Sequence, residues 1–298
     1  MDLSAYFDDS SSDTGERDLV FAGLVNSDEA WRQFAVAWRA ALAKAPTITH
    51  LKMSEANALR GQFASWTRDA RDQKLQILAE VLDRFRPRWT FDVSISRAQY
   101  ASHVAPATAR GLSTPHFAAT FGAVSIVARC LASEGITAPV RFVFDVQEGV
   151  DKDVTLFFDY MVENLDPVSR KLINIPIGYG DEMQDLPLQA ADMLAWHIRR
   201  QRQGDKDLTV TRRAKFLRSN RHIEARVPLD MLIRWSAIFS QVLPILQTLK
   251  SKGKWQRFRA IVDQAKSAGF RPPHGEDPSD TLTNIRAAWD EFENKGMR

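Results

Sequence analysis

Three aspartates occupy comparable places in this chain, at the ends of predicted strands or near the start of a helix. Asp8 ends a short apolar segment that begins at Leu3, and Asp145 ends the segment PVRFVFD. Asp192 lies in the apolar run LQAADMLAW, in the first turns of a predicted helix. Side chains at the strand ends of an α/β sheet converge even when they are far apart in sequence. We therefore expect these three carboxylates to meet in one place.

Carboxylates that are packed together repel one another, and burying them without a counter-ion would force protonation. Bound Mg²⁺ or Mn²⁺ removes this conflict, because these ions prefer hard oxygen ligands. Two such ions about 4 Å apart activate a water and stabilise the leaving oxygen of a phosphodiester. Glu55, which begins a helix after a predicted strand, is a candidate fourth acid.

The same acids also have an ordinary structural interpretation. Asp8 and Asp9 precede serines and could form a solvated turn, and Asp145 could cap the next helix. Asp192 could be a favourable charge near a helix N-terminus. Spacing alone does not decide between the two interpretations.

The first two hundred residues mix strand and helix patterns, which predicts an α/β fold with one central sheet. The helix that starts at Asp28 carries a core-facing stripe of Trp31, Phe34 and Trp38 after a Ser27 cap. The predicted strands are 3–7, 18–26, 48–53, 90–95, 139–145 and 171–175. The predicted helices are 28–44, 55–63, 69–85, 116–131, 152–165 and 188–202.

Beyond Gly204 the pattern changes to a mostly helical, basic extension or small second domain. We therefore predict a first domain over 1–204 and a second region over 205–298, in which only 222–227 reads as a strand. Residues 199–271 carry 18 Lys and Arg against 5 Asp and Glu, whereas the rest of the chain carries 22 against 32. A basic segment beside an acidic body is what a protein that handles a polyanion can look like.

Other chemistries lack a comparable pattern. The single Cys130 excludes an intramolecular disulfide and any multi-cysteine metal site. No glycine-rich phosphate loop, no Gly-x-Ser-x-Gly turn and no zinc-like histidine pair occurs in the sequence. No apolar run approaches the roughly 20 residues of a membrane span, and the first residues lack the features of a signal peptide, so we expect a cytoplasmic protein without membrane partners.

The same residues resemble a known family, the domain-of-unknown-function family 3800, which has a ribonuclease-H-like fold. YFDDSS is similar to its Asp-Glu-Ser-Gly motif, with Asp9 in place of Glu and Ser11 in place of Gly. THLKMSEANALRGQFASW resembles its His-Met-Glu region and FVFD its central acidic strand. LQAADMLAW, the most specific match, resembles its Gln-x-Ala-Asp helix. The resemblance covers roughly the first two hundred residues.

The resemblance implies a central mixed sheet flanked by helices, with carboxylates from the first strand, the central strand and a late helix holding divalent metals. It selects Asp8, Asp145 and Asp192 as Mg²⁺ or Mn²⁺ ligands of a two-ion site, with Glu55 as a further catalytic candidate. Supporting roles fall to Asp9, Ser10 and Gln189, the last of which could orient Asp192 or a bound water.

The leading hypothesis is a metal-dependent nuclease that acts on DNA or RNA. Its candidate phosphate-binding residues are Arg199, Arg200, Arg212, Arg213, Lys215 and Arg218. An alternative is a catalytically inactive module of a phage-defence or mobile-element system that binds nucleic acid or protein. A third interpretation, the acid/base pair of a glycosidase, is disfavoured by the basic extension and by the absence of carbohydrate-stacking motifs.

Overall fold

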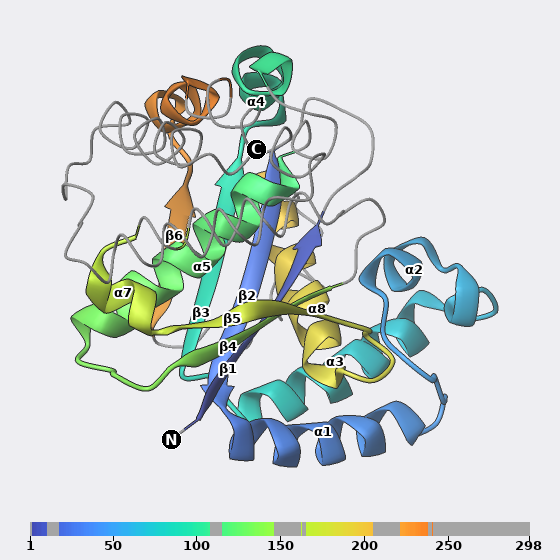
Figure 1. Ribbon diagram of the computed structural model, residues 1–298. Helices are drawn as coiled ribbons and strands as arrows, with labels where there is room; N and C mark the ends of the chain where they lie inside the picture. The colour runs from blue at the N-terminus through green and yellow to red at the C-terminus, as the bar shows by residue number, and fades with distance from the viewer. Residues whose placement is uncertain are drawn as a thin grey trace, which may run out of the picture. The chain divides into compact units, whose positions relative to one another are not determined.

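One mixed sheet forms the centre of the protein. The computed structural model describes residues 2–10, 18–107, 115–145, 162, 165–204, 221–237 and 240. Its described strands follow the order β5-β4-β1-β2-β3-β6 (Figure 1). Their bounds are β1 Leu3–Ser10, β2 Leu19–Ser27, β3 Trp89–Ile95, β4 Val140–Asp145, β5 Ile173–Gly180 and β6 His222–Arg226. β1, β2 and β3 are antiparallel neighbours, whereas β4 and β5 continue parallel to β1, and β6 is parallel to β3.

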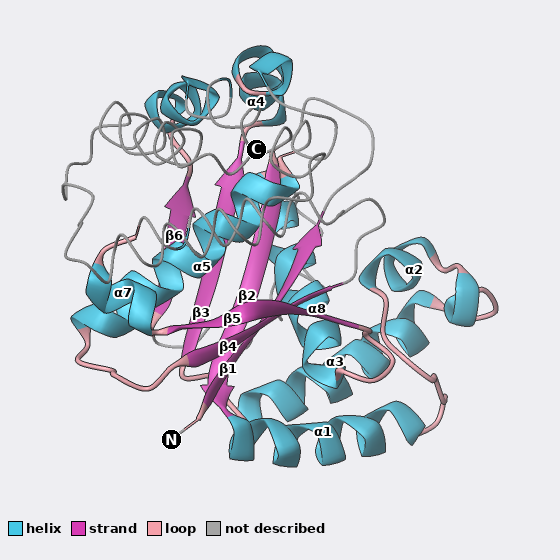
Figure 2. Ribbon diagram, viewed as in Figure 1, coloured by secondary structure: helices cyan, strands magenta, loops and turns pink. Residues whose placement is uncertain are grey.

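Helices cover both faces of this sheet (Figure 2), which confirms the predicted α/β class. One face carries α8, which packs on β1 and β2, and α1 and α3 pack beside it; α5 covers the opposite face. The helices are α1 Asp28–Ala43, α2 Met53–Ala58, α3 Arg68–Arg84, α4 Arg97–His103, α5 His116–Ser133, α7 Pro167–Lys171 and α8 Leu186–Arg202, with 3-10 turns η1 Gly61–Phe63 and η2 Ala105–Ala107.

Successive side chains of β1 point to opposite faces of the sheet, so Phe7 lies on one face and its neighbours Tyr6 and Asp8 lie on the other. Phe7 points to the α5 face, where its ring stacks on Phe144 at a centroid distance of 5.3 Å. Tyr6 belongs to the apolar cluster on the α8 face. Because side chains alternate along a strand, Asp8 shares the face of Tyr6 and therefore faces α8. The polar end of β1 is thus directed at the late helix that carries Asp192.

α5 is the one helix of the described residues that is long and apolar enough to cross a membrane by length and composition. It packs against β2, β3 and β4, and residues such as Ala118, Val124 and Val127 are completely buried there. Its apolar composition is accounted for by its position as a core helix of the fold.

Several predicted elements differ from the structure. The helix expected over 55–63 is α2 Met53–Ala58 followed by η1, and the strand expected over 171–175 is β5 Ile173–Gly180. β1 continues to Ser10 because the pairing with β2 extends as far as Ser10 opposite Val20, so Asp8 and Asp9 lie within a strand instead of a solvated turn. Residues 48–52 form no strand. Their apolar side chains are buried, but the backbone N–H groups of Leu51 and Met53 donate to side chains of α8 instead of to a neighbouring strand.

Contacts divide the chain into two compact units, 1–97 with 115–227 and 98–114 with 228–298. We predicted a domain boundary after Gly204, and this boundary stays a prediction; the predicted strand 222–227 forms as β6 and pairs with β3 in the first of these units. In the second unit, α4, η2 and a helical stretch over 229–237 are described. The expected helix over 152–165 and most of the predicted helical extension lie outside the described residues.

A buried lysine of α3, Lys74, binds the C-terminal end of α1. The Nζ atom of Lys74 is fully buried and donates to the carbonyl oxygens of Ala41, Leu42 and Lys44 at 2.7, 2.9 and 2.7 Å. These carbonyls belong to the C-terminal end of α1, where the regular helical donors run out; those of Ala41 and Leu42 also accept from the backbone N–H groups of Lys44 and Ile48. A charged donor at this end also complements the helix dipole.

We predict that Lys74→Met lowers the free energy of unfolding by about 2–3 kcal/mol, because it leaves buried carbonyls without a charged donor. Urea denaturation at neutral pH measures the change. Gln73→Met, at an exposed position of the same helix, is the matched control and should change stability by less than about 0.5 kcal/mol. Equal losses in the two variants would contradict this role of Lys74.

Candidate metal centre

A row of acidic residues crosses the sheet on the face covered by α8. Asp8 of β1 lies opposite Ala22 of β2, and Ala22 lies opposite Asp92 of β3. Asp92 in turn lies opposite Glu224 of β6. On the other side of β1, Phe7 pairs with Phe144, so the next residues along the two parallel strands, Asp8 and Asp145, extend the same row. The sheet therefore brings together acids from four strands.

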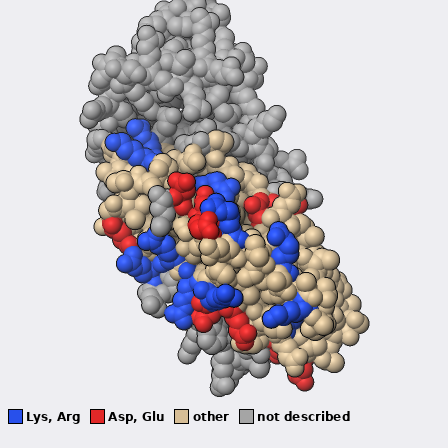
Figure 3. Space-filling model, turned by 90° about the horizontal axis from the view of Figure 1, so that it is seen from below, with Lys and Arg blue, Asp and Glu red and all other residues tan. Residues whose placement is uncertain are grey.

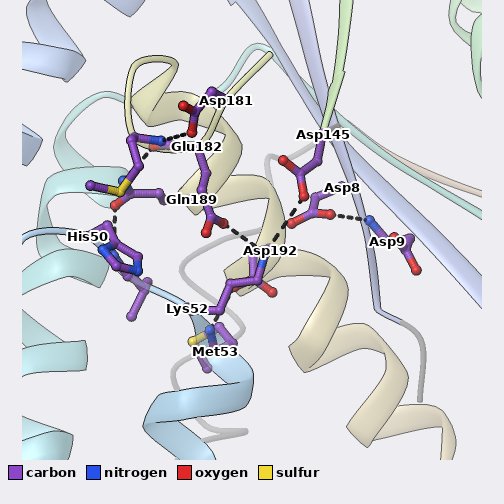
Figure 4. Close-up of polar contacts among 12 residues, drawn as sticks. Asp8, Asp9, His50, Lys52, Met53, Asp145, Asp181, Glu182, Gln189 and Asp192 are labelled. Carbon is purple, nitrogen blue, oxygen red and sulfur yellow. Dashed lines mark hydrogen bonds and ion pairs between the residues drawn. The ribbon is translucent and has the colours of Figure 1, made fainter. Parts of the chain in front are cut away.

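α8 adds Asp192 to the Asp8 end of this row. Leu188, Leu194 and Ala195 of α8 are fully buried, and α8 packs on β1 and β2. Asp192 is 7% exposed and Asp8 is 4% exposed. The Oδ2 atom of Asp192 accepts a hydrogen bond of 2.7 Å from the backbone N–H of Met53. Figure 4 shows the side chains of Asp8, Asp145 and Asp192 directed toward one another, so the structure brings together the three aspartates that the sequence selected.

Two further charged residues complete this cluster, and the sequence analysis missed both. The Nζ atom of Lys52 lies 2.8 Å from Oε2 of Glu182 and 3.7 Å from Oδ2 of Asp145 (Figure 4). Glu182 comes from the turn that joins β5 to α8, and Lys52 immediately precedes α2. We call Asp8, Asp145, Glu182 and Asp192 the acid cluster; one ammonium group, that of Lys52, lies among its four carboxylates.

The charges of the acid cluster are not balanced in its present form. Burial, followed by the charges of Asp192 and Asp145, raises the pKa of Asp8 well above its usual range. Burial also raises the pKa of Asp192 to about 7, although Lys52 and the Met53 N–H act in the opposite direction. Burial lowers the pKa of Lys52, but Asp8, Asp192 and Glu182 outweigh this effect and raise it. Burial is the main cause of the shifts of the two aspartates, and the neighbouring carboxylates act in the same direction.

The other end of the row shows how the same fold neutralises a buried carboxylate. Asp92 is 1% exposed, and it accepts hydrogen bonds from Arg202 of α8 and, at 2.9 Å, from Nε2 of His222. Arg202 also binds Glu224 at 2.6 Å, and Nδ1 of His222 lies 2.8 Å from the hydroxyl of Thr90. Asp92 therefore has a fixed guanidinium and an imidazole beside it, whereas the acid cluster has one lysine for four acids.

The supporting residues have more specific roles than the sequence indicated. The N–H of Asp9 donates to Oδ1 of Asp8 at 2.7 Å, while the Asp9 carboxylate alternates to the opposite face, 3.8 Å from Nε2 of His116. The Oγ atom of Ser10 accepts from Nε of Arg199 at 2.8 Å.

Gln189 organises the loop that carries Lys52. Its Oε1 atom accepts from the indole N–H of Trp38 at 2.9 Å and from the backbone N–H of Leu51 at 3.0 Å. Its Nε2 atom donates to the carbonyl oxygen of Glu182 at 2.7 Å. We expected Gln189 to orient Asp192 or a water; its amide instead holds the chain segments of Lys52 and Glu182 in place.

Glu55, the predicted fourth acid, has its carboxylate against Gly61, and the acid that contacts Lys52 together with Asp145 is Glu182. An added Cβ atom at Gly61 would lie 2.2 Å from Oε2 of Glu55. Gly61 has a φ of +54°, so this position favours glycine for its backbone as well. α2 ends at Ala58 because Leu59 adopts a left-handed conformation, and this break turns the segment after Glu55 away from a continuous helix.

Two of the predicted phosphate-binding residues are described, Arg199 and Arg200, in the last turn of α8. Arg199 contacts Ser10 at the end of β1, two residues from Asp8, and the guanidinium of Arg200 lies 5.0 Å from the ring centroid of Trp196. Arg212, Arg213, Lys215 and Arg218 lie outside the described residues. On the face shown in Figure 3, basic and acidic side chains are interspersed, and no patch of one sign dominates the described part.

The donor set fits a hard divalent cation. Asp8, Asp145 and Asp192 offer carboxylate oxygens, the ligands that Mg²⁺ and Mn²⁺ prefer, and a cation there would remove their mutual repulsion. Within the described ranges, no three His, Cys, Asp or Glu side chains are already arranged as a formed metal site. The ammonium of Lys52 lies among the same oxygens, so metal binding requires this group to move.

The contrast between the two ends of the row gives a test of stability. We predict that, in metal-free buffer at pH 8, Asp8→Asn raises the free energy of unfolding by about 1 kcal/mol, because it removes one of four clustered negative charges. Asp92→Asn is the matched variant in an equally buried place, and it should lower stability by about 2–3 kcal/mol, because it weakens the pairing of Arg202 and His222. Chemical denaturation measures both. A comparable loss in Asp8→Asn would contradict the charge imbalance.

A scan of family models, a search of curated proteins and a search of solved structures found no match to this chain.

Proposed function

We propose that this protein is a divalent-metal-dependent nuclease that hydrolyses phosphodiester bonds of DNA or RNA. The observation that carries the proposal is the convergence of Asp8, Asp145 and Asp192, from two strands and a late helix, in one buried, negatively charged place. A protein that keeps several uncompensated carboxylates together sacrifices stability, and such sites are typical of function.

The three aspartates would hold Mg²⁺ or Mn²⁺, and we propose a two-ion site. The metal would supply the activation of a water and the stabilisation of the leaving oxygen. The residues of the chain position these ligands. Asp192 is held by the N–H of Met53, Asp8 by the N–H of Asp9, and both are shielded from solvent by the packing of α8.

Arg199 is well placed to bind a phosphate of the substrate. Its contact with Ser10 puts a guanidinium at the end of β1, next to the acids, and arginine binds phosphate oxygens with two parallel hydrogen bonds. Arg200 and the basic residues of the segment 199–271 would add sequence-independent affinity for the polyanion. Nucleic acid is therefore the proposed partner, and the cytoplasm is the proposed location.

The central mixed sheet flanked by helices agrees with the ribonuclease-H-like fold that the sequence resemblance implies. Asp8 and Asp192 come from the first strand and the late helix that this resemblance assigns to them, and Asp145 comes from β4, which pairs with the first strand. These two agreements support the assignment of the chain to that fold as part of the proposal.

We predict that Asp145→Asn and Asp192→Asn each lower the rate of Mn²⁺-dependent cleavage of single-stranded DNA or RNA by more than about 100-fold, because each removes a metal ligand. A chelator should abolish the cleavage by the unsubstituted protein. Fluorescence anisotropy should show that both variants still bind the nucleic acid.

Asp83→Asn, on the surface of α3, is the control and should cleave at the original rate. Full cleavage by Asp145→Asn or Asp192→Asn would remove these residues from the proposed site.

One observation favours the second candidate, a binding module without catalysis. The Lys52 ammonium already lies among the carboxylates that a metal would need, at 2.8 Å from Glu182. A permanently bound lysine would make the acid cluster a structural feature. Salt-sensitive nucleic-acid binding without Mg²⁺- or Mn²⁺-dependent turnover, on single- and double-stranded DNA and RNA alike, would support this candidate over the nuclease.

A further inference from the structure

Lys52 lies where a cation is needed and belongs to a chain segment without regular secondary structure. Its Nζ atom is 2.8 Å from Glu182 and 3.7 Å from Asp145, and its charge also acts on Asp8 and Asp192. The side chain of Lys52 is 33% exposed and that of Asp145 is 18% exposed, whereas Asp8 and Asp192 are almost completely buried. The ammonium group can therefore leave toward solvent without unfolding the sheet or α8.

We propose that Lys52 is an exchangeable internal counter-ion, whose ammonium group and a divalent metal ion compete for the same carboxylates. The inference rests on the proposed metal site, but it does not depend on which reaction the metal serves. In the metal-free protein Lys52 holds the acid cluster together; a metal ion replaces it at Asp145 and Asp8.

The type of residue supports exchange over permanent neutralisation. Lysine carries a compact charge on a flexible four-carbon chain, whereas arginine forms rigid, paired hydrogen bonds. The same sheet uses an arginine, Arg202, together with His222 for the carboxylate of Asp92, which it neutralises with a fixed contact. At the acid cluster the cation is instead a lysine, whose Nζ atom lies at the longer distance of 3.7 Å from Asp145.

The segment that carries Lys52 is held at both sides, so the backbone can stay while the side chain moves. The N–H of Leu51 is bound to Gln189 and the N–H of Met53 to Asp192. Rotation of the Lys52 side chain would release the carboxylates of Glu182 and Asp145 without breaking either backbone hydrogen bond. A metal ion can thus enter a site whose ligands are already in place.

If Lys52 competes with the metal ion for the carboxylates, removal of the Lys52 ammonium group should strengthen metal binding. We expect Lys52→Met to bind Mn²⁺ with a dissociation constant about tenfold lower than that of the unsubstituted protein, because no internal cation has to be displaced. Isothermal titration calorimetry with Mn²⁺ alone, on the full chain, measures the constant. Without metal, Lys52→Met should unfold at a lower temperature, and saturating Mn²⁺ should bring the two unfolding temperatures together.

Three variants control the experiment. Lys52→Arg keeps the charge and should bind Mn²⁺ no more tightly than the unsubstituted protein. Lys171→Met removes a lysine from an exposed position of α7 and should change nothing. Lys52→Met combined with Asp145→Asn should lose the tight binding, which places the ion at the acid cluster.

The outcomes of this experiment distinguish a failure of the Lys52 exchange from a failure of the proposed nuclease function. Tighter Mn²⁺ binding by Lys52→Met supports the exchange, even if no nucleic acid is cleaved. Unchanged or weaker binding by Lys52→Met, in a protein that binds Mn²⁺ and cleaves nucleic acid, overturns the exchange and leaves the nuclease standing. If neither the unsubstituted protein nor Lys52→Met binds Mn²⁺, both the exchange and the metal site are overturned.

Discussion

Repulsion among buried carboxylates is the constraint around which this part of the fold is organised. Asp8 and Asp145 are brought side by side by the parallel pairing of β1 and β4, and the packing of α8 adds Asp192 from above the sheet. In a place with little water, such charges stay together only when hydrogen bonds and cations act on them. Backbone N–H groups supply part of this requirement, and Lys52 supplies one charge. The divalent ion that we propose would bring further positive charge to the same carboxylates.

The two ends of the acidic row show two solutions to one problem. Asp92 is as buried as Asp8, yet an arginine and a histidine from neighbouring elements bind it directly. Such a carboxylate is a structural part of the sheet and ties β3 to β6 and α8. In the acid cluster, by contrast, the cation that contacts Glu182 and Asp145 is the ammonium group of Lys52, at the end of a flexible side chain. This difference, within one face of one sheet, is why we propose a divalent ion at the acid cluster and none at Asp92.

The sequence predicted the three aspartates because each lies next to an apolar segment whose period identifies its element. It could not predict Glu182 or Lys52, since their contact joins residues 130 positions apart and follows no periodic pattern. The prediction of a strand over 48–53 was wrong for a related reason. Ile48, Leu51 and Met53 are buried as in a strand, but the backbone N–H groups of Leu51 and Met53 bind side chains of a helix about 140 residues later. β1 was predicted too short because its pairing, and not its hydrophobicity, carries it to Ser10.

The central claim is that a divalent ion takes the place among Asp8, Asp145 and Asp192 that Lys52 now shares. Crystals soaked in Mn²⁺ and measured at an anomalous wavelength test it most directly. The account predicts an anomalous peak between the three aspartates, with the Nζ atom of Lys52 moved away from Asp145. Ordered aspartates without an anomalous peak at saturating Mn²⁺, and with Lys52 still bound to Glu182 and Asp145, would contradict it.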